Sequence, residues 1–118
     1  MTTFKLRILF GEAMLGPGKA ALLVLIRDTG SIAAAGRQMG MSYKRAWMLV
    51  EEMNAAFRAP LVTSARGGPG GGGAQLTPEG AEVLRLYHTV LEEARAATAP
   101  QIAALESMLR PRDIPDGE

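Results

Sequence analysis

The 118-residue sequence contains no cysteine and a single histidine, His88. The absence of cysteine excludes a disulfide framework, a thiolate nucleophile and a cysteine-bound zinc ion. His88 alone cannot assemble a transition-metal site or a nucleophile–base pair, so we expect it to pack on a helix surface or at a dimer interface. Paired carboxylates of a recognisable catalytic pocket are also missing. We therefore predict that the chain is not an enzyme and that it has no catalytic, metal or cofactor site.

Long apolar runs are missing too. No stretch approaches the roughly 18 residues that span a bilayer, and residues 1–5 lack the apolar region of a signal peptide, so we expect a cytoplasmic protein with no membrane partner. The net charge is only +1, but it is unevenly distributed. Residues 31–76 carry a net charge of +3, whereas residues 77–118 carry −4. This asymmetry predicts different roles for the two regions.

The first thirty residues predict a strand and a helix. Apolar and basic residues alternate over residues 4–10, which is the pattern of a half-buried strand, and Gly11 ends it. After a turn at residues 16–18, Leu22, Leu25 and Ile26 fall on one face of a helix that ends at residues 29–30.

The next segment has the pattern of a helix-turn-helix. Ser31 is a suitable N-cap for a short helix over residues 32–39, and Gly40 supplies a left-handed stop. Ser42 then caps a second helix over residues 43–57. A buried stripe is expected on this second helix, formed by Ala46, Val50, Met53 and Phe57. Two helices joined by such a tight turn form the helix-turn-helix motif.

A hairpin and a long helix follow. Residues 61–66 and 74–76 predict two strands around a glycine-rich loop, which would form a wing. Thr77 can cap, and Pro78 can begin, a last helix that should break or kink at Pro100. The predicted fold is mainly α with a small β wing, namely a winged helix-turn-helix plus a C-terminal dimerisation helix. We predict a winged domain over residues 1–77, a dimerisation region of the same structural domain over 78–110, and a frayed tail over 111–118.

The start of the second helix has the chemistry of a DNA contact. Backbone N–H groups and the helix dipole attract phosphate there, and Lys44 or Arg45 can donate to guanine in a major groove. The alternative is that both cations only solvate the helix and pair with Glu51 and Glu52. The candidate DNA-binding residues are Ser31, Arg37, Ser42, Tyr43, Lys44, Arg45, Arg66, Gly67 and Gly68.

Other features favour less specific roles. Residues 68–73 match G-x-G-x-x-G only because they are rich in glycine, and no helix opens from them, so nucleotide binding is not supported. Trp47 is expected to pack against the wing or the first helix rather than on a base. The apolar stripe of the last helix needs a partner, and its candidate dimerisation residues are Val83, Leu84, Tyr87, Val90, Leu91 and Ala94.

Residues 30–47, from Gly30-Ser31-Ile32 to Arg45-Ala46-Trp47, resemble the helix-turn-helix of ModE, the molybdate-dependent transcription regulator. The resemblance continues through the glycine-rich wing and residues 74–80, and it covers most of residues 4–91. LysR-type regulators share the helix-turn-helix outline more distantly. Pro69 departs from the pattern, because relatives can have a basic residue in the wing there.

This resemblance implies a homodimer joined through the last helix, with residues 42–45 entering double-stranded DNA and Arg66 leading into the wing. In full-length relatives a C-terminal domain senses molybdate, and since no such domain follows here we expect no molybdate pocket, although a separate sensor protein is conceivable. We expect a sequence-specific regulator that binds a roughly palindromic operator. The alternative is a winged-helix protein-interaction module with weak, non-specific DNA binding.

Overall fold

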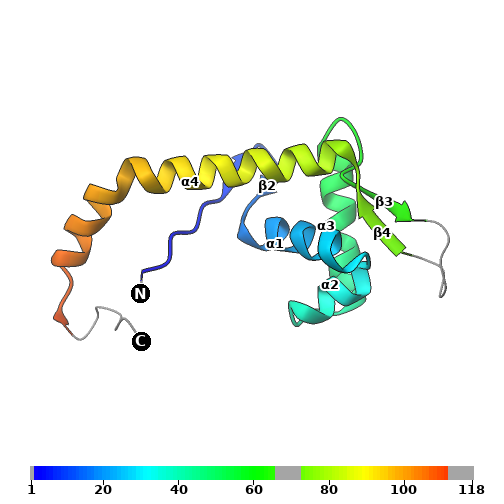
Figure 1. The fold of residues 1–118 in the computed structure, drawn as a ribbon, viewed down its shortest axis with the longest axis horizontal. Helices are drawn as coiled ribbons and strands as arrows, with labels where there is room; N and C mark the ends of the chain where they lie inside the picture. Colours follow the sequence, from blue (N-terminus) through cyan, green and yellow to red (C-terminus); the bar gives the residue numbers. More distant parts are fainter. Residues whose placement is uncertain (1, 66–72, 112–118) are drawn as a thin grey trace.

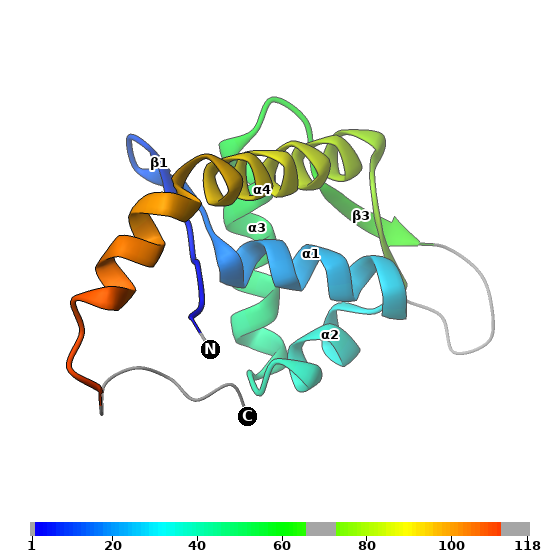
Figure 2. The same ribbon diagram turned by 60° about the vertical axis from the view of Figure 1, so that its left-hand side comes forward.

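The computed structural model describes residues 2–65 and 73–111. These residues form four helices and two β-hairpins in an elongated molecule (Figure 1). The helix α1 lies between α4 and α2 in both views of the ribbon (Figures 1 and 2). The wing hairpin and the far part of α4 project from opposite sides of this body (Figure 1).

The N-terminal strand is shorter than predicted. Only Ile8–Phe10 forms strand β1, which pairs in antiparallel fashion with β2, Ala13–Leu15, a strand that the sequence pattern did not predict. Residues 4–7 nevertheless keep the alternation of half-buried and exposed side chains. This segment is extended because it lies against a helix, where the Tyr87 hydroxyl donates to the Leu6 carbonyl at 2.7 Å.

The predicted first helix is confirmed as α1, Pro17–Thr29, which begins with proline in its first turn. Gly30 ends it in the left-handed conformation, with a φ of +72°. Leu22, Leu23 and Ile26 are fully buried, because α2 and α4 cover this helix on either side. It is therefore the centre of the hydrophobic core.

The helix-turn-helix is formed by α2, Ile32–Gln38, and α3, Tyr43–Ala56. Both predicted caps are present: the Ser31 hydroxyl accepts from the Ala34 N–H at 3.0 Å, and the Ser42 hydroxyl accepts from the Arg45 N–H at 3.1 Å. Each cap satisfies a backbone N–H that has no partner within its helix.

Close approach and turn geometry fix how α2 and α3 meet. At Gly36 an added Cβ would lie 3.0 Å from the Ala46 Cβ, so the absence of a side chain lets the helices touch. Gly40 has a φ of +71°, as the predicted left-handed stop requires. The predicted stripe on α3 is buried at Ala46, Val50 and Met53, whereas Phe57, just beyond the helix, is half-buried.

The wing consists of β3, Val62–Ala65, and β4, Gly73–Leu76, paired in antiparallel register. The Asn54 side chain fixes its base, since its oxygen accepts from the Leu61 N–H at 2.8 Å and its amide donates to the Val62 carbonyl at 3.1 Å. The Ala74 N–H also donates to the Gly30 carbonyl at 2.9 Å. These bonds place the hairpin beside both helices of the motif.

The last helix, α4, runs from Pro78 to Ser107 and is capped by Thr77, whose hydroxyl accepts from the Gly80 N–H at 2.9 Å. Pro100 lies inside it, so the expected interruption is a kink and not a break: the helix continues, and its axis turns in the orange part of the ribbon (Figure 1). Proline has no N–H to donate one turn back, and its ring crowds that carbonyl. No helix in residues 2–65 and 73–111 is long and apolar enough to cross a membrane.

Candidate nucleic-acid interface

The first turn of α3 is an exposed cationic end of the helix-turn-helix. Tyr43, Lys44 and Arg45 are all exposed directly after the Ser42 cap, and 57% of Tyr43 is accessible. The first turn of α3 contains no acidic residue. Its backbone N–H groups and the positive end of the helix dipole therefore act together with two full charges.

The acidic residues of α3 do not neutralise these cations. Among the described residues, the ion pairs are Lys19–Glu52, Arg27–Asp28, Arg58–Glu79, Arg85–Glu82 and Arg95–Glu92. Glu52 pairs with α1 at 3.3 Å instead of with its own helix. The alternative in which Lys44 and Arg45 are tied to Glu51 and Glu52 is thus not what the described part of the chain shows.

The candidates on α2 have separate environments. Arg37 is exposed in the last turn of α2, just before the turn that leads to α3. Ser31 is half-buried, and its hydroxyl oxygen caps α2. Arg37 therefore adds positive charge near the start of α3, whereas the hydroxyl of Ser31 is used to cap α2.

A polar groove of about 260 Å³ separates α3 from the wing. Trp47 lines it beside residues of the wing and is 45% exposed, so it lies outside the buried core. Its packing against the wing or the first helix rather than on a base stays a prediction. The buried stripe of α3 runs through Ala46 and Val50, and the indole lies one position off that stripe. Thr63 and Ser64 of β3 line the opposite wall of the groove. Neither residue was among the candidates selected from the sequence.

The candidate wing residues Arg66, Gly67 and Gly68 lie outside the described residues. The two described strands lead toward that segment from the side of α3.

The candidate dimerisation residues divide into two groups. Val83, Leu84 and Tyr87 are buried in the core of their own chain. Val90 is 44% exposed, and Leu91 and Ala94 are half-buried. Leu86, which the sequence pattern did not select, is 48% exposed one turn before Val90. The buried group holds α4 on the body. The other residues form an apolar surface that is exposed or half-buried.

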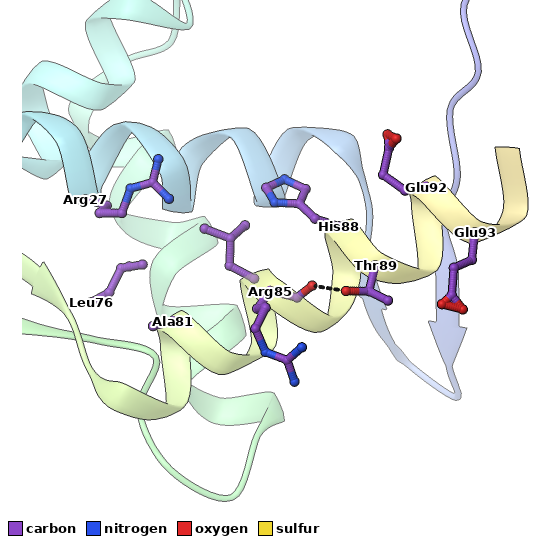
Figure 3. A pocket seen from close by; sticks show the side chains of 9 residues that line it. Arg27, Leu76, Ala81, Arg85, His88, Thr89, Glu92 and Glu93 are labelled. Atoms are coloured by element: carbon purple, nitrogen blue, oxygen red, sulfur yellow. Dashed lines mark hydrogen bonds between the residues drawn. The ribbon is translucent and has the colours of Figure 1, made fainter. Parts of the chain in front are cut away.

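His88 lies in a pocket of about 510 Å³ along α4 and is directed toward α1 (Figure 3). Arg85, Thr89 and Glu92 line the same pocket, and the Thr89 hydroxyl donates to the Arg85 carbonyl at 3.0 Å (Figure 3). Within the described ranges, no cluster of three histidine, aspartate or glutamate side chains could hold a metal ion.

Two helices joined by a tight turn and followed by a β-hairpin define the winged helix-turn-helix class of proteins. Residues 19–81 match the family described as bacterial regulatory helix-turn-helix protein, lysR family. The chain belongs to this family.

The chain is similar to relatives named as a molybdenum-pterin-binding protein and as transcriptional regulators. It is 43% identical over 97 residues to the molybdenum-pterin-binding protein MopB of Rhodobacter capsulatus, a match that covers 82% of this chain and 34% of MopB. It is 38% identical over 96 residues to the transcriptional regulator ModE of Yersinia pestis, covering 79% of this chain and 36% of ModE. It is 44% identical over 71 residues to the DNA-binding transcriptional dual regulator ModE of Escherichia coli K12, covering 60% of this chain and 27% of that protein.

These relatives confirm the resemblance to ModE, and the chain spans about a third of the length of the first two. A structural neighbour is the DNA-binding domain of CbnR, solved in complex with DNA, at a TM-score of 0.57 and 20% identity. The match covers 75% of this chain and 95% of that domain. It confirms the predicted winged helix-turn-helix fold with a long final helix.

Proposed function

We propose that this chain is a DNA-binding regulator of transcription, without enzymatic activity, that recognises a roughly palindromic operator as a homodimer. The observation that carries the proposal is the first turn of α3, where Lys44 and Arg45 are exposed next to a wing and make no ion pair within the described residues. Relatives named as transcriptional regulators support it.

In this proposal α3 enters the major groove with its N-terminal end first. Lys44 or Arg45 donates to the O6 and N7 acceptors of guanine, and Ser42 and Tyr43 bond phosphates or base edges. Arg37 adds a phosphate contact from the end of α2. Arg66, Gly67 and Gly68 remain proposed contacts of the wing with the neighbouring minor groove or its phosphates.

The homodimer is proposed to form through α4. Leu86 and Val90 are exposed one turn apart, which leaves an apolar strip on a helix already anchored to the body. Leu91 and Ala94 lie beside this strip. A two-fold axis at such an interface places two copies of α3 on one face of DNA, in successive major grooves about 34 Å apart.

Charge reversal tests the DNA contact. We expect Lys44→Glu combined with Arg45→Glu to weaken binding at least about 100-fold, because each removes a cation and adds a repelling carboxylate. The readout is anisotropy of a labelled duplex selected on the protein from a random pool. The matched control, Lys5→Glu with Arg110→Glu, changes the net charge equally at exposed positions outside the motif and should retain most of the affinity.

Both double variants should melt at the wild-type temperature, because all four side chains are exposed. Unchanged DNA binding by the α3 variant would contradict the proposed recognition helix and favour a protein-interaction module.

Light scattering tests the dimer. We expect Leu86→Glu with Val90→Glu to halve the molar mass, since charges placed in an apolar interface lose water without gaining a partner. Leu84 is unsuitable for this test, because only 3% of it is exposed and its substitution would disturb the monomer. Glu82→Gln, at another exposed position of α4, is the control. If the variant kept the mass of a dimer, the dimer interface would have to lie outside this strip.

A cytoplasmic location and a separate sensor protein stay predictions of the sequence.

A further inference from the structure

Methionine is the only amino acid that supplies sulfur to this chain, because the sequence contains seven methionines and no cysteine. Six of these methionines lie in the described residues. Four of the six are buried or half-buried, namely Met14, Met39, Met41 and Met53. The other two, Met48 and Met108, are exposed, at 41% and 80%. A dissolved oxidant therefore reaches the thioethers of Met48 and Met108 before the other four.

Met48 lies on the outward side of α3. It follows Lys44 by four positions, so the two side chains lie on the same face of the helix. The opposite side carries the buried residues of α3, namely Ala46, Leu49, Val50 and Met53. The thioether of Met48 is thus exposed beside a cation of the proposed DNA contact and directed away from the core.

We propose that Met48 is a site of reversible oxidation through which hydroperoxides weaken DNA binding, an inference that rests on the proposed function. A lone pair of the Met48 sulfur attacks one oxygen of hydrogen peroxide, and the O–O bond breaks. The attacked oxygen stays on sulfur as a sulfoxide, while its proton joins the departing hydroxide to form water. Sulfur loses two electrons, and the peroxide gains them. Two thiols reverse the step through methionine sulfoxide reductases, giving a disulfide and releasing the oxygen as water.

The sulfoxide differs from the thioether in how it meets DNA. A thioether is apolar and suits contact with the methyl group of thymine, whereas a sulfoxide presents an oxygen that only accepts hydrogen bonds. The guanine edge in the major groove and the phosphates also present acceptors. Two acceptors cannot bond to each other, so DNA binding removes water from the sulfoxide without replacing its hydrogen bond. Oxidation of Met48 therefore opposes binding.

Oxidation of Met48 should leave the fold intact. Its side chain is exposed and lies outside the hydrophobic core, so the added oxygen stays in water in the free protein. Met41 provides the contrast, because its Cγ lies 3.5 Å from a Cβ added at Gly36, where α2 and α3 meet. Oxidation of Met41 would disturb the helix-turn-helix itself, so folding has to be measured in parallel.

Met108 supplies an internal control. It is more exposed than Met48 and lies directly after α4, at the end of that helix that projects from the body (Figure 1). The same treatment converts both thioethers, but only the sulfoxide of Met48 lies on α3. A loss of DNA binding that depends on Met48 and not on Met108 thus identifies the site.

Mild treatment with hydrogen peroxide tests the proposal. Peptide mass spectrometry follows the oxygen added at each methionine, and anisotropy measures binding of the selected duplex before and after treatment. We expect the affinity of the wild type to fall about tenfold once Met48 is converted, with an unchanged circular-dichroism melt, because an acceptor is left without a partner in the interface. Reductases that act on both sulfoxide epimers should restore the affinity.

Two leucine variants separate the two exposed sites. Met48→Leu keeps an apolar side chain of similar volume that peroxide does not oxidise, and Met108→Leu makes the same change beyond α4. Each protein is compared with its own untreated sample, so any direct effect of leucine on affinity cancels. We expect Met48→Leu to lose the sensitivity to peroxide and Met108→Leu to retain the full loss.

Three results contradict the inference. An unchanged affinity of the wild type after complete conversion of Met48 would leave the proposed function standing and remove the oxidation site. A loss that persists in Met48→Leu, or that disappears in Met108→Leu, would place the effect elsewhere in the chain. An untreated wild type that does not prefer the selected duplex would refute the proposed function, and the inference with it.

Discussion

The two ends of α4 differ in burial. Near its start, Gly80, Val83, Leu84 and Tyr87 are buried against the body. From residue 92 to residue 111 no residue is buried. Leu105 of α4, and Met108 and Leu109 just beyond its end, remain exposed, at 63%, 80% and 44%. One continuous helix is therefore a core element at one end and a projecting element at the other.

The difference indicates what each end depends on. A short isolated helix is marginal in water, so the far end is supported by propagation from the anchored end. The N-terminal segment adds to this support, because Phe4 lines a shallow pocket with Ala99 and Ile102, and the Thr2 hydroxyl donates to Glu106. Stability should thus be concentrated in the winged body, and the far end should tolerate change.

The largest loss of stability is expected from a substitution at the junction between α4 and the body. At Gly80 an added Cβ would lie 2.1 Å from the Leu61 carbonyl oxygen, so Gly80→Ala must displace backbone. We expect a loss of about 4 kcal/mol in the free energy of unfolding, measured by urea denaturation. At Gly18 in α1 an added Cβ meets nothing within 4 Å, and Gly18→Ala should change stability by less than about 1 kcal/mol. Equal effects would mean that α4 does not approach the Leu61 carbonyl this closely.

Truncation of one leucine in each region sharpens the comparison. Leu22 is fully buried and Leu105 is 63% exposed. Leu22→Ala should lower the free energy of unfolding by about 3 kcal/mol, because it removes buried methyl groups and leaves a cavity. Leu105→Ala should change it by less than about 0.5 kcal/mol at protein concentrations where the chain is monomeric. A comparable loss at Leu105 would show that the far end is packed.

The smallest effect concerns the bond between α4 and the N-terminal segment. Tyr87→Phe removes the hydrogen bond to Leu6 and should cost about 1 kcal/mol at neutral pH. Burial raises the pKa of the Tyr87 phenol above its ordinary value. A raised pKa in the folded state favours the protonated form, so its stabilisation is complete below the unfolded pKa near 10 and is lost as the pH rises through the folded pKa.

The comparison of melts above and below pH 10 tests this effect. Wild type should lose stability in the alkaline range, and the phenylalanine variant should lack that component of the loss. Parallel curves for the two proteins would contradict a buried phenol.

Local signals made much of this fold predictable from the sequence. Ser31, Ser42 and Thr77 each cap a helix where capping chemistry indicated, and Gly40 turns the chain as predicted. These features depend on residues within a few positions of each other. The exposed first turn of α3 could be predicted for the same reason.

Features that depend on tertiary packing could not be predicted in the same way. The apolar stripe of α4 correctly indicated a buried face, but periodicity does not reveal whether the same chain or a partner buries it. Val83, Leu84 and Tyr87 are buried by the body, whereas Leu86 and Val90 stay exposed. Likewise, Trp47 lies at the margin of its stripe, where its exposure depends on the position of the wing.

The proposal that α3 and the wing recognise specific DNA is tested most directly by anisotropy titration of a duplex selected from a random pool and of its scrambled counterpart, across a range of salt concentrations. We predict that the selected duplex binds about 1000-fold more tightly and that both affinities fall steeply with salt. Weak and equal binding of the two duplexes would contradict sequence-specific recognition and identify the domain as a non-specific or protein-binding module.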